Sequence, residues 1–247
     1  MKVILLFYSP LNLFVFKIIL MKLFAFDLQG TLVQNNNHAV LESTNLSLEK
    51  HGRKERATLE FCTEKEGEPW GNYFRELCRD ASDDDTKSMV DYALSLDDLV
   101  IPKYVRPTMH AISILEEIKR RKDSVLIISG TNREAFEKYM KYISMKHLID
   151  EFIGIANREE VKGNYDVAEW KGRELRKFMS RNDFEEGIFT GDKPDDMKAG
   201  IIAGTTNFFF NQDGIRYPFA DYCITDLRFI LPIIYERFKP KTGYFNI

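Results

Sequence analysis

KLFAFDLQGTLV at positions 22–33 decides the fold, because a short apolar run ends there at an aspartate followed by a glycine turn. The run 22–26 shows no polar alternation, which is typical of a strand buried on both faces of a parallel sheet. Asp27 closes the run, and Gly30 and Thr31 follow it. The segment therefore predicts a central strand that carries a carboxylate at its carboxyl end.

Runs of the same kind recur further along the chain and predict the rest of a sheet. They are SVLIIS (124–129), FIGIA (152–156), GIFTG (187–191), TNFFF (206–210) and YCIT (222–225). Apolar residues at helical spacing lie between them, in 108–120, 133–146 and 171–181. This alternation predicts an α/β fold with a doubly wound parallel sheet, whose active site lies at the carboxyl ends of the strands.

Residues 34–105 interrupt the alternation, because about seventy positions pass without a second strand. A loop of that length without structure would be unusual, so an inserted helical module is the better interpretation. We expect helices over 41–50, 70–79 and 86–96, within a cap domain of residues 34–105. The core domain would then consist of residues 21–33 and 106–247.

Residues 1–20 are strongly apolar, but Pro10, Asn12 and Lys17 interrupt them, which leaves the run marginal in length for a membrane span. The predicted first strand follows almost at once, so a span ending at position 20 would have hardly any linker. We interpret residues 1–20 as an apolar N-terminal extension, with Met21 as the natural start. An element docked on the domain and a membrane anchor are the two alternatives.

The composition fits a globular protein and excludes several partners. The chain has 247 residues, of which 44% are hydrophobic and 30% charged, and its net charge is −3. The sequence has no excess of basic residues that would indicate binding to nucleic acid. The three cysteines are widely spaced and form no C-x-x-C pair, so we expect a reduced, cytoplasmic protein. The oligomeric state cannot be inferred from this sequence.

Polar side chains follow the predicted strands at the points where each strand ends. Asp27 can act as a nucleophile that accepts a phosphoryl group. Asp192 ends another strand and Asp196 follows four residues later, and their oxygens suit Mg²⁺. Ser129 and the backbone amides at Gly130 can donate to phosphoryl oxygens. Together these groups supply the positioning and charge stabilisation that phosphoryl transfer requires.

The order D-x-x-G-T, S-G, Lys and G-D-x-x-x-D resembles the haloacid dehalogenase superfamily over roughly residues 21–238. The insertion resembles a helical cap of the C1 type, and the S-G pair with KGREL is loosely similar to the phosphoserine-phosphatase branch. The resemblance implies Mg²⁺ held by Asp27, Asp192, Asp196 and the backbone carbonyl of residue 29. It also implies a substrate phosphate that is contacted by Thr31, Ser129, Gly130, Lys171 and Lys193.

Two lysines are candidates for the one that neutralises the substrate phosphate. Lys171 begins a predicted helical stretch, at a distance from Asp192 that resembles the phosphoserine-phosphatase type. Lys162 is the alternative, because helical periodicity extends back through Ala168 and Tyr165. We prefer Lys171. Lys193 either touches the substrate or caps the turn beside Asp192.

Gln29 departs from the family, whose phosphatases usually carry a second aspartate at this position as the general acid and base. A glutamine side chain has no titratable proton, and loss of such a group typically costs about 10²- to 10⁴-fold in rate. Three interpretations follow. The protein acts on phosphates with good leaving groups or uses another acid; it is a slow phosphatase or phosphotransferase; or it is a pseudophosphatase that binds a phosphorylated ligand or a partner protein. We favour an enzyme that acts on a small phosphorylated metabolite through an aspartyl-phosphate.

Overall fold

The computed structural model describes residues 21–66, 68, 70–155 and 166–235. The expected extension at 1–20 and the alternative lysine at 162 lie outside these residues. Within the described ranges, none of the helices combines the length and the apolar character that crossing a membrane requires.

A six-stranded parallel sheet forms the core, with the strand order β5-β4-β1-β6-β7-β8. The strands are β1 (Leu23–Phe26), β4 (Ser124–Ser129), β5 (Glu151–Gly154), β6 (Gly187–Gly191), β7 (Thr206–Phe210) and β8 (Tyr222–Ile224). The predicted doubly wound α/β fold is therefore confirmed, and each predicted strand lies within two residues of its observed position. β1 pairs with both β4 and β6, so Asp27 lies at the centre of the sheet.

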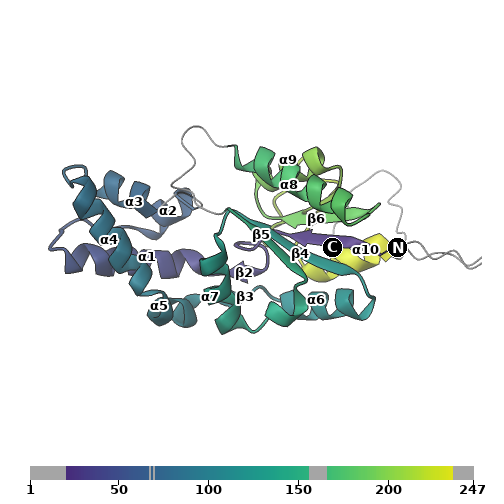
Figure 1. Ribbon diagram of the computed structural model, residues 1–247, viewed down its shortest axis with the longest axis horizontal. Helices are drawn as coiled ribbons and strands as arrows, with labels where there is room; N and C mark the ends of the chain where they lie inside the picture. Colours follow the sequence, from purple (N-terminus) through teal and green to yellow (C-terminus); the bar gives the residue numbers. More distant parts are fainter. Residues whose placement is uncertain (1–20, 67, 69, 156–165, 236–247) are drawn as a thin grey trace, which may run out of the picture.

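Helices cover both faces of the sheet (Figure 1), which explains why the strands show no polar alternation. Phe24 and Phe26 pack in a cluster with residues from one helical layer, and Leu23 and Ala25 pack in a second cluster on the opposite face. The first layer contains α6 (Ala111–Arg120), α7 (Arg133–Ile143) and α10 (Ile230–Tyr235), and the second contains α8 (Val167–Arg181) and α9 (Pro194–Ala203).

Two core helices differ from their predicted bounds for local reasons. α8 begins at Val167 because the Asp166 side chain accepts a hydrogen bond from Glu169 N and caps the helix there. Lys171 therefore lies in the second turn of α8, and the expectation that it begins the helix is wrong. α7 ends at Ile143, where Ser144 adopts a left-handed conformation (φ 53°), rather than continuing to residue 146.

A helical module lies at the opposite end of the long axis from the sheet (Figure 1). Its helices are α1 (Asn36–Lys50), α2 (Leu59–Glu64), α3 (Trp70–Leu77), α4 (Asp83–Ser95) and α5 (Asp97–Tyr104). The start of α1 is polar, α2 has only six residues and α5 contains Pro102, so apolar periodicity does not reveal them. The module has its own small clusters, one of which contains Leu48, Phe74 and Met89.

A two-residue antiparallel pair joins the module to the core. β2 (Val33–Gln34) leads into the module and β3 (Arg106–Pro107) leads out of it, with Val33 opposite Pro107 and Gln34 opposite Arg106. Because β2 follows Asp27 after a short turn, the module is inserted directly beside the carboxyl end of β1.

Candidate active site

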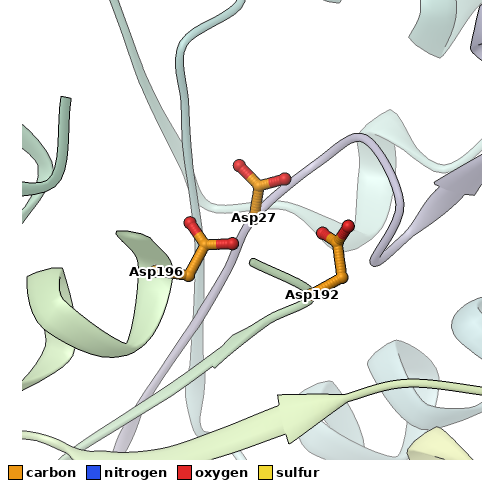
Figure 2. A group of neighbouring side chains, drawn as sticks. All are labelled: Asp27, Asp192 and Asp196. Carbon is orange, nitrogen blue, oxygen red and sulfur yellow. The ribbon is translucent and has the colours of Figure 1, made fainter. Parts of the chain in front are cut away.

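Three carboxylates converge where β1 and β6 end (Figure 2). Asp27 follows β1, Asp192 follows β6, and Asp196 lies in the first turn of α9. One oxygen atom from each lies within 4.8 Å of the others. The register explains the convergence, because Phe26 pairs with Thr190 and the Asp27 amide donates to the Thr190 carbonyl at 2.9 Å.

Lys171 reaches this cluster from α8. Its Nζ donates to Asp27 Oδ1 at 2.6 Å and to Asp196 Oδ1 at 2.7 Å, and its side chain is only 8% exposed. The next residue, Gly172, makes the approach of α8 to α9 possible. A Cβ at this position would lie 2.6 Å from the Ile202 Cβ. The sheet and both helices thus position one buried ammonium between two of the three carboxylates.

Burial governs the protonation of this cluster. It raises the pKa of Asp27 to about 6, although the positive charge of Lys171 opposes the shift. It also raises the pKa of Asp192 well above the usual range, and the negative charges of Asp27 and Asp196 add to the effect. Burial would lower the pKa of Lys171, but the two carboxylates outweigh burial and raise it. The lysine is therefore charged at neutral pH.

The turn after Asp27 fits tightly against Asp192. Gly30 has φ 82°, and a Cβ at this position would lie 2.1 Å from Asp192 Oδ2, so only glycine fits here. The Thr31 hydroxyl is fully buried and donates to Asp192 Oδ1 at 2.9 Å. Thr31, predicted to bind substrate, thus holds a carboxylate of the cluster in place.

Ser129 ends β4, the strand next to β1, and is 3% exposed. Its Oγ accepts a hydrogen bond from the amide of Thr131 at 3.2 Å, and this bond shapes the turn that contains Gly130. The structure therefore brings Ser129 and Gly130 to the same edge of the sheet as the carboxylates.

Lys193 contacts both the core and the helical module. Its amide donates to Asp196 Oδ2 at 3.1 Å, at the start of α9. Its ammonium, on a side chain that is 42% exposed, forms an ion pair with Glu66 Oε2 at 2.7 Å. Glu66 lies between the helices that the sequence predicts over 41–50 and 70–79, where no residue pattern indicates a functional group. Sequence reasoning therefore misses this residue.

Gln29 is held by a hydrogen-bonded chain that sequence reasoning also misses. Its Nε2 donates to the Tyr139 hydroxyl at 3.2 Å, and that hydroxyl donates in turn to Asn36 Oδ1. Tyr139 comes from α7 and Asn36 begins α1. The Gln29 side chain is thus linked to the point where the helical module starts. No local pattern relates these three residues.

The donor set fits a hard divalent cation. The cluster presents three carboxylates to one buried ammonium, and the raised pKa values of Asp27 and Asp192 reflect this excess of negative charge under burial. Both oxygens of Asp196 already accept hydrogen bonds, from Lys171 and from the Lys193 amide. Oxygens of Asp27 and Asp192 are therefore the donors best placed for a metal such as Mg²⁺, which prefers carboxylates and water.

Comparisons with known proteins give a family match in sequence and similar folds among solved structures. A sequence model described as haloacid dehalogenase-like hydrolase matches residues 24–209. No curated protein sequence matches the chain. Among solved structures, a HAD-superfamily hydrolase of subfamily IA from Geobacter sulfurreducens has a TM-score of 0.66 at 16% identity, covering 87% of this chain and 96% of the other.

Two further structures are similar to this chain in fold. One is described as a predicted phosphoglycolate phosphatase from Haemophilus somnus, with a TM-score of 0.65 at 16% identity and coverage of 87% of this chain and 98% of the other. The second is CbbY from Rhodobacter sphaeroides in complex with phosphate, with a TM-score of 0.63 at 13% identity and coverage of 83% and 93%.

Proposed function

The chain belongs to the haloacid dehalogenase-like hydrolase family, and from this premise we propose that it is a Mg²⁺-dependent phosphatase that works through an aspartyl-phosphate. The observation that carries the proposal is the cluster of Asp27, Asp192 and Asp196, with Lys171 bonded to Asp27 and Asp196. We place the enzyme in the cytoplasm, since its three cysteines are free thiols.

Asp27 supplies the nucleophile. With a pKa near 6 it is mostly ionised at neutral pH. One carboxylate oxygen attacks phosphorus, the bond from phosphorus to the leaving oxygen breaks, and the electron pair stays on that oxygen. Lys171, the Ser129 hydroxyl and the amides at Gly130 offset the charge on the phosphoryl oxygens. Asp27, Asp192 and the Gln29 carbonyl, with support from Asp196, would hold a Mg²⁺ ion, which would supply additional charge neutralisation when bound.

Gln29 limits which substrates react quickly. Its side chain carries no titratable proton and donates to Tyr139, so it cannot protonate a leaving alkoxide. Acyl and aryl phosphates need little protonation and should react well, whereas alkyl phosphates should react slowly. The substrate is a small phosphorylated molecule, and the helical module over the site selects it.

A protein that binds a phosphorylated ligand without turnover is the second candidate. The observation that favours it is the same glutamine, held by Tyr139 at the position where an acid would act. A dehalogenase does not need a metal, so the clustered Asp192 and Asp196 argue against that activity.

The test is phosphate release by the full chain with Mg²⁺ from acetyl phosphate, p-nitrophenyl phosphate and a sugar phosphate. Gln29→Asp, its matched control Gln29→Asn, and Asp27→Asn run in parallel. The proposal expects release from the first two substrates that disappears in Asp27→Asn. It also expects faster release from the sugar phosphate in Gln29→Asp but not in Gln29→Asn.

Two other outcomes would decide against it. No release from the wild type, with activity gained in Gln29→Asp, would identify a binding protein on an intact scaffold. No release from any variant would exclude phosphatase activity on these substrate classes.

A further inference from the structure

The segment between α2 and α3 carries a carboxylate from the helical module into the active site. Glu66 forms its ion pair with Lys193 at 2.7 Å, and its side chain is only 13% exposed. The residue before it is anchored, because the Lys65 carbonyl accepts a hydrogen bond from the Tyr73 hydroxyl at 2.8 Å. Glu66 is thus held at this position by the module and by the core together.

Lys193 connects Glu66 to the catalytic carboxylates. Burial is the main influence on the pKa values of Asp27 and Asp192, but the positive charge of Lys193 lowers both. Its ammonium is therefore near enough to act on the cluster, while the same ammonium touches Glu66. Through this ion pair, the carboxylate of Glu66 is joined to the residue that follows Asp192 in the chain.

The geometry of phosphoryl transfer indicates on which side of phosphorus a base is needed. The attacking and leaving oxygens lie roughly in line through phosphorus. Asp27 attacks from the sheet, so the leaving group departs on the opposite side, toward the module. Water that later hydrolyses the aspartyl-phosphate must approach from that same side. A base for this water is expected on the module rather than on the sheet.

The other ionisable groups near Gln29 are poorly suited to this task. Burial raises the pKa of Tyr139 far above its usual range, and the negative charges of Asp97 and Glu66 add to the shift. Its hydroxyl therefore stays protonated at neutral pH and remains bonded to Asn36. Asp97 pairs at 2.9 Å with Lys138 on α7, whereas the partner of Glu66 is Lys193, the residue next to Asp192. Gln29 itself has no basic form.

We propose that Glu66 is the general base that hydrolyses the aspartyl-phosphate, in place of the carboxylate missing at Gln29. Glu66 takes one proton from water as the water oxygen bonds to phosphorus. The bond from phosphorus to the Asp27 oxygen breaks, and its electron pair returns to the Asp27 carboxylate. Inorganic phosphate leaves, and Glu66 then releases its proton to solvent. This inference rests on the proposed phosphatase function.

The test compares Glu66→Gln with Glu68→Gln on p-nitrophenyl phosphate with Mg²⁺. The glutamine at position 66 keeps an oxygen that can accept from Lys193 but removes the basicity. Glu68 lies in the same segment and pairs with Lys65 instead, so it is the matched control. Glu66→Gln should reduce steady turnover by about 10²-fold or more. It should first release one p-nitrophenol per enzyme and then accumulate a phosphorylated Asp27 that mass spectrometry detects.

A second variant separates basicity from structure. Glu66→Ala should regain turnover with added formate but not with chloride at the same ionic strength, because formate can replace the missing carboxylate. Glu68→Gln should turn over like the wild type and show neither accumulation nor rescue.

Three results would overturn the assignment. Unchanged turnover in Glu66→Gln would mean that Glu66 takes no part. Reduced turnover without phosphorylated Asp27 and without formate rescue would give Glu66 a purely structural role. Absence of Asp27-dependent release from the wild type would remove the phosphatase itself, and the Asp27→Asn comparison distinguishes this failure from the other two.

Discussion

The sheet core and the helical module hold their charged groups in opposite ways. In the core, Lys171 and its partners Asp27 and Asp196 have side chains that are at most 8% exposed. The ion pairs that the module forms with the core are more open. Lys193 is 42% exposed in its pair with Glu66, and in the pair of Asp98 with Lys141 both side chains are more than half exposed.

This difference separates what is fixed from what can be displaced. When one partner of a buried ion pair is lost, the other charge stays buried without compensation. Breaking up the buried arrangement of the core site would therefore cost much free energy. An exposed pair is weak because water screens both charges. Exposed pairs such as Asp98 with Lys141 therefore contribute little to holding the module, while buried charges fix the geometry around Asp27.

Among the tests of this difference between core and module, removal of Lys171 should change the free energy of unfolding most. Lys171→Met leaves Asp27 and Asp196 without their buried cation, and we expect a loss of about 3–5 kcal/mol in the free energy of unfolding at pH 7. Urea denaturation measures it. Lys177→Met on the same helix, whose side chain is 55% exposed and pairs with Glu174, should change little. Similar losses in both variants would contradict the distinction.

The loss of the Asp27 proton should have the next largest effect on the free energy of unfolding. Burial raises the pKa of Asp27 from 3.8 to about 6 in the folded protein. The folded state therefore retains this proton longer than the unfolded chain. The stability that it contributes is complete below pH 4 and is lost as the pH rises through 6, by about 3 kcal/mol. Without metal at pH 7, Asp27→Asn should unfold at a higher temperature than the wild type.

Calorimetry from pH 4 to pH 8 checks this expectation. The wild type should lose stability relative to Asp27→Asn as the pH rises, and Mg²⁺ should narrow the gap by neutralising the cluster. If the difference in stability between the wild type and Asp27→Asn stayed constant with pH, Asp27 would not titrate as its burial requires.

The boundary between the two regions can be tested at Tyr139. Tyr139→Phe removes the hydroxyl that accepts from Gln29 and donates to Asn36, and leaves both amides short of a partner. We expect a loss of about 1–2 kcal/mol in unfolding free energy. Tyr142→Phe on the same helix, whose hydroxyl bonds to exposed Asp98, is the control. Equal urea midpoints for the two variants would mean that the buried chain adds nothing.

The smallest effect is expected at the exposed side of the module. Asp98→Asn weakens its contacts with Lys141 and Tyr142, both of which are open to water. The urea midpoint should remain within the error of the measurement, at low and at high salt. A clear loss of stability at low salt would show that the module is held by charge after all.

Sequence patterns predict the two regions unequally, for a physical reason. The strand SVLIIS matches β4 residue by residue, because a strand buried on both faces must be apolar throughout. The module buries polar side chains such as Ser43, Thr44 and Ser47 on α1, so its apolar pattern is weak. The prediction consequently starts α1 five residues late, at Leu41 instead of Asn36.

The residues of the site also differ in how well the sequence predicts them. Asp27, Ser129 and Asp192 are predictable because each lies at the end of a predictable strand. The contacts of Gln29 with Tyr139 and of Glu66 with Lys193 join residues far apart in the chain, on elements whose relative placement no local pattern gives. Lys171 is intermediate, because its neighbourhood is helical in the sequence but its partners depend on the packing of α8 against α9.

The pair of β2 with β3 gives the molecule the architecture of a socket. Val33 and Pro107 lie side by side, so the chain leaves and re-enters the core at a single point. Closing a loop there depends only weakly on its length, by about 0.6 kcal/mol for each doubling. The helical module between these residues can be exchanged, in evolution or by design, without disturbing the register of β1. An exchanged insert would leave the carboxylates and Lys171 of the core in place, but it would replace Asn36 and Glu66, so the proposed base and the contacts of Gln29 would change with it.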